Sequence, residues 1–229
     1  MIGRIGRAML IAAALATAGG PRSALASLGT VQVQIRLPVD ASLETHGIRR
    51  ILVGGFLTGD YERINVPGET VHLLRSAMKK HTDFLVLDDA PPSLPEQRLE
   101  DLKTNSAFFE TIGREFNADL IVAGEVNFTG IDTSGFVQEE IVSAATGRRS
   151  VRTRYVERTN FKLRLDLIFL NGRDGSLLYQ TTFSQDEMLD AEEADALSAF
   201  YALADRFLDG YLRILTPGEQ VETRTLFTD

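Results

Sequence analysis

Cysteine is absent from the 229-residue chain, and histidine occurs only three times. Without cysteine we expect no disulfide, no thiol nucleophile, no thiolate metal site and no lipid on a processed cysteine. His46 is predicted on a loop, His72 within a helix and His81 at that helix's end. Because His72 and His81 are not at metal-ligand spacing on one helical face, no metal-binding residue is predicted.

Catalytic and phosphate-binding motifs are also missing. The glycine-rich segment 54–59 follows an expected strand, but it lacks Gly-Lys-Ser/Thr and the G-x-G-x-x-G spacing. We expect Gly54 and Gly55 instead to let a helix pack close to the strand. No Gly-x-Ser-x-Gly nucleophile elbow occurs. The sequence therefore predicts no catalytic and no cofactor-binding residue, and we expect that the protein is not an enzyme.

Three pairs of adjacent acids have structural interpretations. Asp88-Asp89, before two prolines, fits a turn; Glu139-Glu140 should point to opposite faces of a strand; and Glu192-Glu193 suits the first turn of a helix. The alternative is a hydrolase or transferase that uses carboxylates. Asp88, Asp119 and a histidine meeting in one cleft would favour that alternative.

The first 26 residues are typical of a secretory signal peptide. Arg4 and Arg7 precede an uncharged, mostly apolar run over residues 8–20, and Ala24-Leu25-Ala26 supplies a cleavage site. The run is shorter than the roughly 20 residues that span a bilayer. We therefore expect cleavage after Ala26 and a location outside the cytoplasm, either periplasmic or secreted, with outer-membrane association left open.

Charge and length restrict the remaining residues 27–229, which we expect to form a single domain. Removing Arg4, Arg7 and Arg22 changes the formal charge from −8 to −11. An acidic domain is poorly suited to bind nucleic acid or anionic lipid, because both need a basic surface. No later run of 18 apolar residues occurs, so no membrane-spanning helix is expected.

Hydrophobic periodicity predicts the order of the elements. Strands are expected at 31–37, 51–56, 84–87, 120–126 and 161–167, and helices at 68–80, 99–116 with a break near Asn105, and 191–215. Residues 128–183 look like successive hairpins, with turns at 145–148 and 171–175. The fold class predicted is α/β, with a mixed β-sheet flanked by helices and an extended antiparallel hairpin region. The predicted core consists of Val53, Phe56, Leu74, Leu85, Leu87, Ile121, Val122, Phe161, Leu165, Leu167 and Phe207.

One cluster of positive charge stands out on the expected long hairpin. It consists of Arg148, Arg149, Arg152, Arg154 and Arg158. One interpretation is a solvated edge strand whose charges prevent aggregation. The other is an arm that docks on an acidic partner, with Arg148, Arg149, Arg152 and Arg154 as the contact residues.

Several segments resemble the curli-secretion CsgG family and the related TolB amino-terminal-like domains. They are the strand ending in Gly-Phe at Phe56, the helix with Leu73-Leu74, the run 84–88, Ile112-Gly113, the segment Ala118-Asp119-Leu120-Ile121-Val122-Ala123-Gly124-Glu125-Val126, and the turn that begins at Asp174-Gly175. The resemblance covers residues 48–215, and its most specific part is 118–126.

This resemblance implies a cell-envelope domain with a role in assembly or transport and without catalysis. The expected partners are other envelope proteins or further copies of the chain. A subunit of a CsgG-like outer-membrane secretion channel is an alternative. The candidate membrane hairpin, residues 136–157, carries charges on both faces, whereas a membrane strand alternates apolar and polar residues. A soluble periplasmic scaffold or adaptor is therefore favoured.

Overall fold

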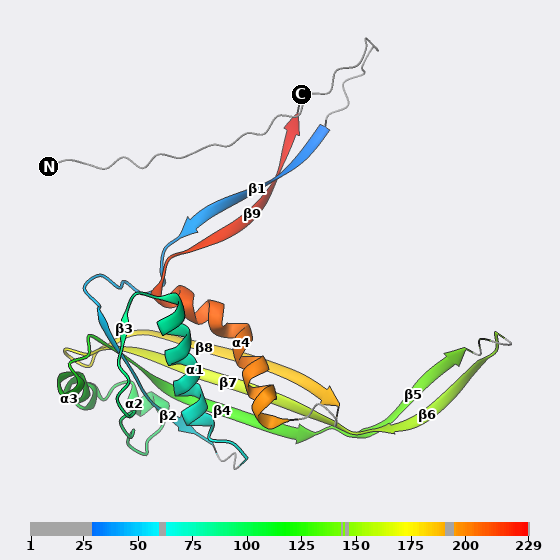
Figure 1. Cartoon of the computed structure of the whole chain (residues 1–229), viewed down its shortest axis with the longest axis horizontal. Coiled ribbons are helices and arrows are strands. Elements are labelled where there is room, and N and C mark those ends of the chain that lie inside the picture. Colours follow the sequence, from blue (N-terminus) through cyan, green and yellow to red (C-terminus); the bar gives the residue numbers. More distant parts are fainter. Residues whose placement is uncertain (1–28, 60–62, 143, 145–146, 191–194, 229) are drawn as a thin grey trace, which may run out of the picture. The chain divides into compact units, whose positions relative to one another are not determined.

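The structure is a computed structural model that describes residues 29–59, 63–142, 144, 147–190 and 195–228 (Figure 1). The expected signal peptide (1–26), the turn residues Ala145 and Thr146, and the pair Glu192-Glu193 lie outside the described residues. The chain divides into two compact units, residues 1–37 with 221–229 and residues 38–220.

The smaller unit contains a two-stranded ribbon. Strand β1 (Gly29–Val39) pairs with β9 (Gly218–Thr228). The predicted alternation is present, but Val33, Ile35 and Leu37 are only half-buried. The alternation of residues 31–37 predicts one buried and one solvent-facing side, whereas the apolar side is only half-buried in the described part of β1. Strand β9 was not predicted from the sequence.

The larger unit contains a five-stranded mixed sheet in the order β3-β2-β4-β7-β8. Its strands are β2 (Arg50–Thr58), β3 (Leu85–Val86), β4 (Leu120–Asp132), β7 (Arg158–Asn171) and β8 (Leu177–Asp190). β2 is parallel to β3 and β4, whereas β4–β7 and β7–β8 are antiparallel. The predicted α/β class is confirmed: strands joined through helices pair in parallel, and the later hairpin extends the sheet antiparallel.

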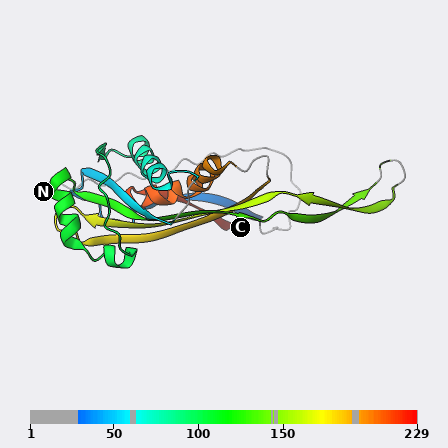
Figure 2. The same ribbon diagram turned by 90° about the horizontal axis from the view of Figure 1, so that it is seen from below.

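Helices cover both faces of this sheet (Figure 2). α1 (Val66–His81) and α4 (Ala196–Leu215) pack on one face, and α2 (Leu99–Leu102) and α3 (Ser106–Phe116) on the other. The predicted break in the second helical region is confirmed, because the Asn105 side chain caps α3 by accepting from Phe108 N–H at 3.3 Å. None of the helices in the described ranges combines the length and hydrophobicity needed to cross a bilayer.

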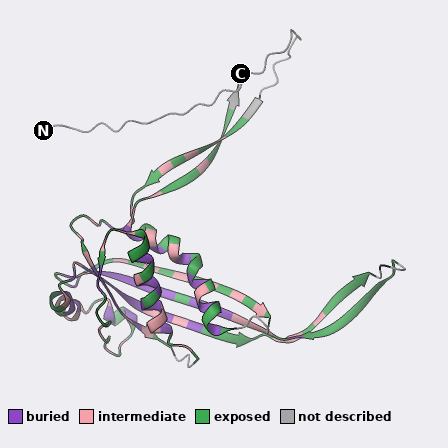
Figure 3. Ribbon diagram, viewed as in Figure 1, coloured by how far each residue is buried: buried purple, intermediate pink, exposed green. Residues whose placement is uncertain are grey.

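The buried residues form two clusters, one on each face of the sheet, and they lie mainly along the central strands and the helices (Figure 3). The predicted core is confirmed at Val53, Phe56, Leu74, Leu87, Ile121, Val122, Phe161, Leu165, Leu167 and Phe207. It is wrong at Leu85, which is 58% exposed. β3 is an edge strand of two residues, and Leu85 points to the face opposite Phe84 and Val86, at the open border of the sheet.

The glycine pair in β2 makes room for a loop, not for a helix as expected. A Cβ on Gly55 would lie 2.8 Å from the carbonyl oxygen of Pro92, whereas one on Gly54 would make only ordinary contacts. The loop that follows β3 therefore packs directly on β2 at Gly55.

Exchanging one predicted core residue and the exposed Leu85 tests these assignments. We expect Ile121→Ala to lower the free energy of unfolding by about 2–5 kcal/mol, because it opens a cavity beneath α3. Leu85→Ala should cost less than about 0.5 kcal/mol. Denaturant unfolding measures both, and equal losses would contradict the placement of Leu85.

Two tyrosines of α4 allow a second comparison. The Tyr201 hydroxyl donates to the carboxylate of Glu69 on α1, whereas the buried Tyr211 hydroxyl has no hydrogen-bond partner within the described residues. An unpartnered buried hydroxyl costs about 1–3 kcal/mol. We expect Tyr211→Phe to raise the melting temperature and Tyr201→Phe to lower it. A decrease for both variants in calorimetry would show that the Tyr211 hydroxyl is satisfied.

Candidate functional site

The predicted arginine cluster lies on a hairpin that forms a sheet of its own. β5 (Gly135–Val142) and β6 (Arg149–Val156) pair antiparallel as a two-stranded ribbon. Arg149, Arg152 and Arg154 lie on β6, and Arg148 immediately precedes it. Along the ribbon only Val156, at its base, is fully buried, so nearly all of its side chains are in contact with solvent (Figure 3).

The ribbon continues the central strands and is anchored where it leaves them. β4 leads into β5, and β6 into β7, through short connections. Thr133 N–H donates to the Arg158 carbonyl at 2.9 Å, and Arg158 N–H donates to Ser134 Oγ at 3.0 Å. Arg158, the fifth arginine of the cluster, also pairs with Asp190 of β8 through its Nε at 2.9 Å. Arg158 therefore fixes the base of the ribbon.

The four predicted contact residues do not share one face. Directly opposite residues of an antiparallel pair point the same way, and the register sets Arg152 opposite Glu139 and Arg149 opposite Val142. Arg152 and Arg154 thus lie on one side, which we call the basic face. Arg149 lies on the other side.

The two adjacent glutamates also separate, as expected. Glu140 accepts from Arg149 at 3.4 Å on one face, and Glu139 lies 3.8 Å from Arg154 on the other. These exposed pairs neutralise two arginines but contribute little stability. Within the described residues, Arg148 and Arg152 have no ion-pair partner and remain available to an external acid.

The face opposite the basic face carries exposed aromatic side chains that the sequence reading missed. Phe136 and Tyr155 are directly opposite and make an edge-to-face contact with centroids 5.3 Å apart. They are 78% and 54% exposed, and Val142 and Val151 on the same face are also exposed. We call this side the aromatic face. The sequence contained a signal for this pair. Phe136 lies as far before Ala145 as Tyr155 lies after Thr146, so a hairpin symmetric about the position between Ala145 and Thr146 would set them opposite each other.

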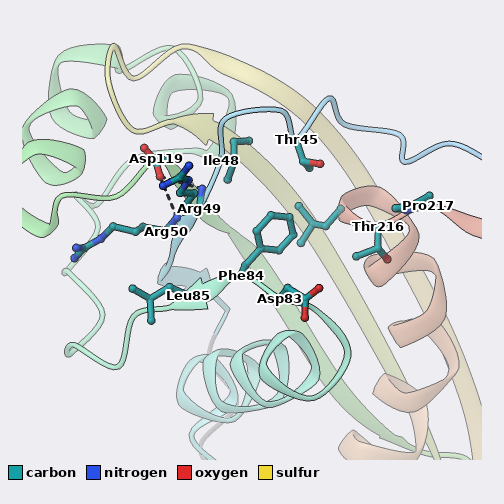
Figure 4. A pocket seen from close by; sticks show the side chains of 11 residues that line it. Thr45, Ile48, Arg49, Arg50, Asp83, Phe84, Leu85, Asp119, Thr216 and Pro217 are labelled. Carbon is teal, nitrogen blue, oxygen red and sulfur yellow. Dashed lines mark hydrogen bonds between the residues drawn. The ribbon is translucent and has the colours of Figure 1, made fainter. Parts of the chain in front are cut away.

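A separate open pocket of about 710 Å³ lies where β2, β3 and β4 begin (Figure 4). Arg49, Phe84 and Asp119 are among its lining residues. The Asp119 carboxylate accepts the backbone N–H groups of Arg49 and Arg50, both at 3.0 Å. Arg173 Nη2 lies 3.7 Å from Asp119 Oδ1. Asp119 therefore acts as a clamp between the starts of β4 and β2.

The electrostatics of Asp119 oppose a role as a general base. Partial burial alone would raise the pKa of its carboxyl, but the N–H groups of Arg50 and Arg49 and the charge of Arg173 outweigh it, and the pKa is lowered. A base for neutral pH needs a raised pKa. The lowered pKa keeps Asp119 ionised and hydrogen-bonded.

The structure does not bring Asp88 to Asp119. Asp119 shares a pocket with His46, whereas Asp88 lines another pocket with His72. The hydrogen bond from Lys79 lowers the pKa of Asp88. The three histidines are exposed, on a loop and on α1 as expected, and the described part of the chain holds no group of three residues placed to bind a metal.

The Asp119 clamp predicts a pH-dependent loss of stability. Asp119→Asn should lower the free energy of unfolding by about 1–3 kcal/mol at neutral pH, since the charge that the two N–H groups bind is lost. A lowered folded-state pKa gives stability that is present above the unfolded value near 3.8 and is lost as pH falls through the folded value. The difference from wild type should therefore shrink below about pH 4. Urea unfolding from pH 7 to pH 3 measures it, with the exposed Asp83→Asn as control; a constant difference would contradict the clamp.

No protein-family model and no curated protein matches the chain. Among solved structures, it is similar to lipoprotein GNA1162 from Neisseria meningitidis, with 13% identity over 72% of this chain and 98% of that one and a TM-score of 0.36. The LpoB C-terminal domain from Salmonella enterica has 11% identity over 65% and 86%, with a TM-score of 0.34. A PelC dodecamer from Paraburkholderia phytofirmans has 9% identity over 81% and 99%, with a TM-score of 0.38. TM-scores this low assign neither a family nor a function to the chain.

Proposed function

We propose that this chain is a non-catalytic cell-envelope protein that acts as a scaffold or adaptor in envelope assembly or secretion. The β5–β6 ribbon is its contact with a partner, either another envelope protein or a further copy of the chain. The envelope location is supported by the signal-peptide pattern of residues 1–26 and by the resemblance to CsgG-like domains.

The exposed Phe136–Tyr155 pair is the observation that carries this proposal. Two large aromatic side chains in solvent do not stabilise a core, and aromatic residues are enriched where protein interfaces bury their energetic centre. The pair sits on a ribbon whose base is held by Arg158. A partner would meet a surface that is already ordered at its base, which lowers the entropy cost of binding.

The charges of the ribbon define the kind of partner. Arg148 and Arg152, which have no ion-pair partner among the described residues, would attract an acidic surface. The rest of the chain is acidic overall, with a formal charge of −8 for the full sequence. The ribbon would therefore steer an acidic partner to itself and away from the remaining surface.

The channel alternative is less well supported by this geometry. A lipid-facing strand surface needs apolar residues at alternate positions through the membrane. The aromatic face includes Glu140 and Arg149, and the basic face includes Glu139, Arg152 and Arg154. Neither side of the ribbon presents an uninterrupted apolar stripe.

The hydrolase or transferase alternative is also less well supported. It required Asp88, Asp119 and a histidine in one cleft, but Asp88 and Asp119 line different pockets. Asp119, which does share a pocket with His46, is held ionised by backbone N–H groups.

Changing the arginines to serine tests the contact. The variant with Arg148, Arg149, Arg152 and Arg154 replaced by Ser should capture less partner from envelope extract while its melting temperature stays unchanged. The difference from wild type should narrow at high salt, because exposed charges are screened beyond about 3 Å at 1 M ionic strength. Quantitative capture at low and high salt measures the effect.

A matched variant separates ribbon charge from net charge. Replacing the exposed Lys80, Arg98, Arg114 and Lys162 with Ser removes the same charge elsewhere and should leave capture unchanged. Phe136→Ser with Tyr155→Ser should weaken capture at both salt concentrations. Identical capture by wild type, the ribbon arginine variant and the aromatic variant would rule out the ribbon as the contact.

A further inference from the structure

The outer edge of β8 is the longest open hydrogen-bonding edge of the five-stranded sheet. β8 has 14 residues and pairs only with β7, and no described strand pairs with its other side. Natural edge strands are usually short or guarded by lysine, proline or a bulge. β8 contains no lysine, arginine or proline, and the part from Leu177 to Gln185 carries no charge at all; its one register shift against β7 falls at Leu178, near its start.

We infer that this edge pairs, antiparallel and about a two-fold axis at Phe183, with β8 of a second copy. The two sheets would then form one continuous sheet, because each strand supplies the backbone donors and acceptors that the other lacks. This surface is distinct from the β5–β6 ribbon, so the inference does not rest on the proposed function.

The side chains of β8 complement themselves in this register. Leu178 and Met188 are 41% and 54% exposed, although each is a large apolar residue; Leu178 lies at the register shift between β7 and β8, and Met188 lies in their regular pairing. Pairing about Phe183 brings Leu178 close to Met188 of the second copy, and the symmetry repeats this contact. Two exposed apolar pairs become buried against each other.

The acids of β8 are compatible with this register. They all lie in its second half, at Asp186, Glu187 and Asp190. Pairing about Phe183 sets Asp186 opposite Gln180 and Glu187 opposite Tyr179, so that no acid faces another acid. Pairing about Asp186 or Glu187 would put each of them directly opposite itself, which is destabilising.

Helix α4 supplies positive charge at the junction. Arg206 pairs with Glu187 of its own chain at 2.7 Å, and a Cβ on Gly210 would lie 3.0 Å from the Phe183 ring. Arg213 is on the same helical face as Arg206, seven residues further along, which is towards the Tyr179 end of β8. In the paired sheet, Glu187 of the second copy lies opposite Tyr179, at that end of β8.

Charge substitutions at Gln180 test the register through self-association. Gln180→Glu places like charges opposite Asp186 at both symmetric positions and should weaken dimerisation about tenfold; Gln180→Lys places opposite charges there and should not weaken it. Sedimentation of the full chain measures both. The same two changes at Gln34, an exposed strand glutamine in the other unit, should give equal affinities. A monomeric wild type, or equal effects of Gln180→Glu and Gln180→Lys, would overturn the inference.

The absence of native cysteine permits a direct test by disulfide formation. Gln180→Cys mixed with Asp186→Cys should cross-link under mild oxidation, because directly opposite Cβ atoms come near the 3.5–4.5 Å that a disulfide needs. Either variant alone should not cross-link, since its two copies of the cysteine lie six residues apart, about 20 Å. Cross-linking of either variant alone would overturn the register. Disulfides formed in envelope extract only with a different protein would show that the edge takes another partner's strand and would overturn pairing with a second copy.

Discussion

The carboxylate of Asp119 holds together the end of the sheet from which the central strands start. Its Oδ2 accepts from the backbone N–H groups of Arg49 and Arg50 just as β2 begins. The backbone N–H of Asp119 in turn donates to the Arg50 carbonyl at 2.9 Å. The Asp119 carbonyl accepts from Gly172 N–H at 2.8 Å. One residue therefore aligns β2 with β4 and positions the turn between β7 and β8. Parallel strands have no hairpin to set their register, so a contact of this kind supports the alignment that core packing also favours.

Close backbone packing at glycines completes the same arrangement. A Cβ on Gly113 of α3 would lie 1.8 Å from the Gly172 carbonyl oxygen, and one on Gly124 of β4 would lie 2.0 Å from that of Asp166 on β7. Any side chain at these positions would force the backbones apart. The segment 118–126, which carries the most specific part of the resemblance, thus has a structural explanation. It helps to determine how β2, β4, β7 and α3 come together.

Local sequence signals predicted the elements well and their exposure less well. The helix cap at Asn105 and the turn at 171–175 depend on hydrogen bonds between residues close in sequence, so they could be placed from the sequence alone. Leu85 could not, because its exposure depends on β3 lying at the edge of the sheet. β9 could not either, since its partner β1 is nearly the whole chain away. The arginine cluster was placed correctly on its hairpin, but its division between two faces required the register of β5 against β6.

The two proposed surfaces are physically linked through the contact between Arg158 and Asp190. Asp190 ends β8, and Arg158 fixes the base of the β5–β6 ribbon, so the ribbon begins where the edge of β8 ends. In a pair joined through β8 about Phe183, the strands run in opposite directions, and the two ribbon bases lie at opposite ends of the shared sheet. At about 3.4 Å per residue they are separated by roughly 48 Å. Such a pair would hold two partner molecules apart, or bind two sites on one large assembly with the gain in affinity that bivalent attachment gives. Self-pairing at β8 would thereby place two of the proposed β5–β6 contact ribbons on one assembly.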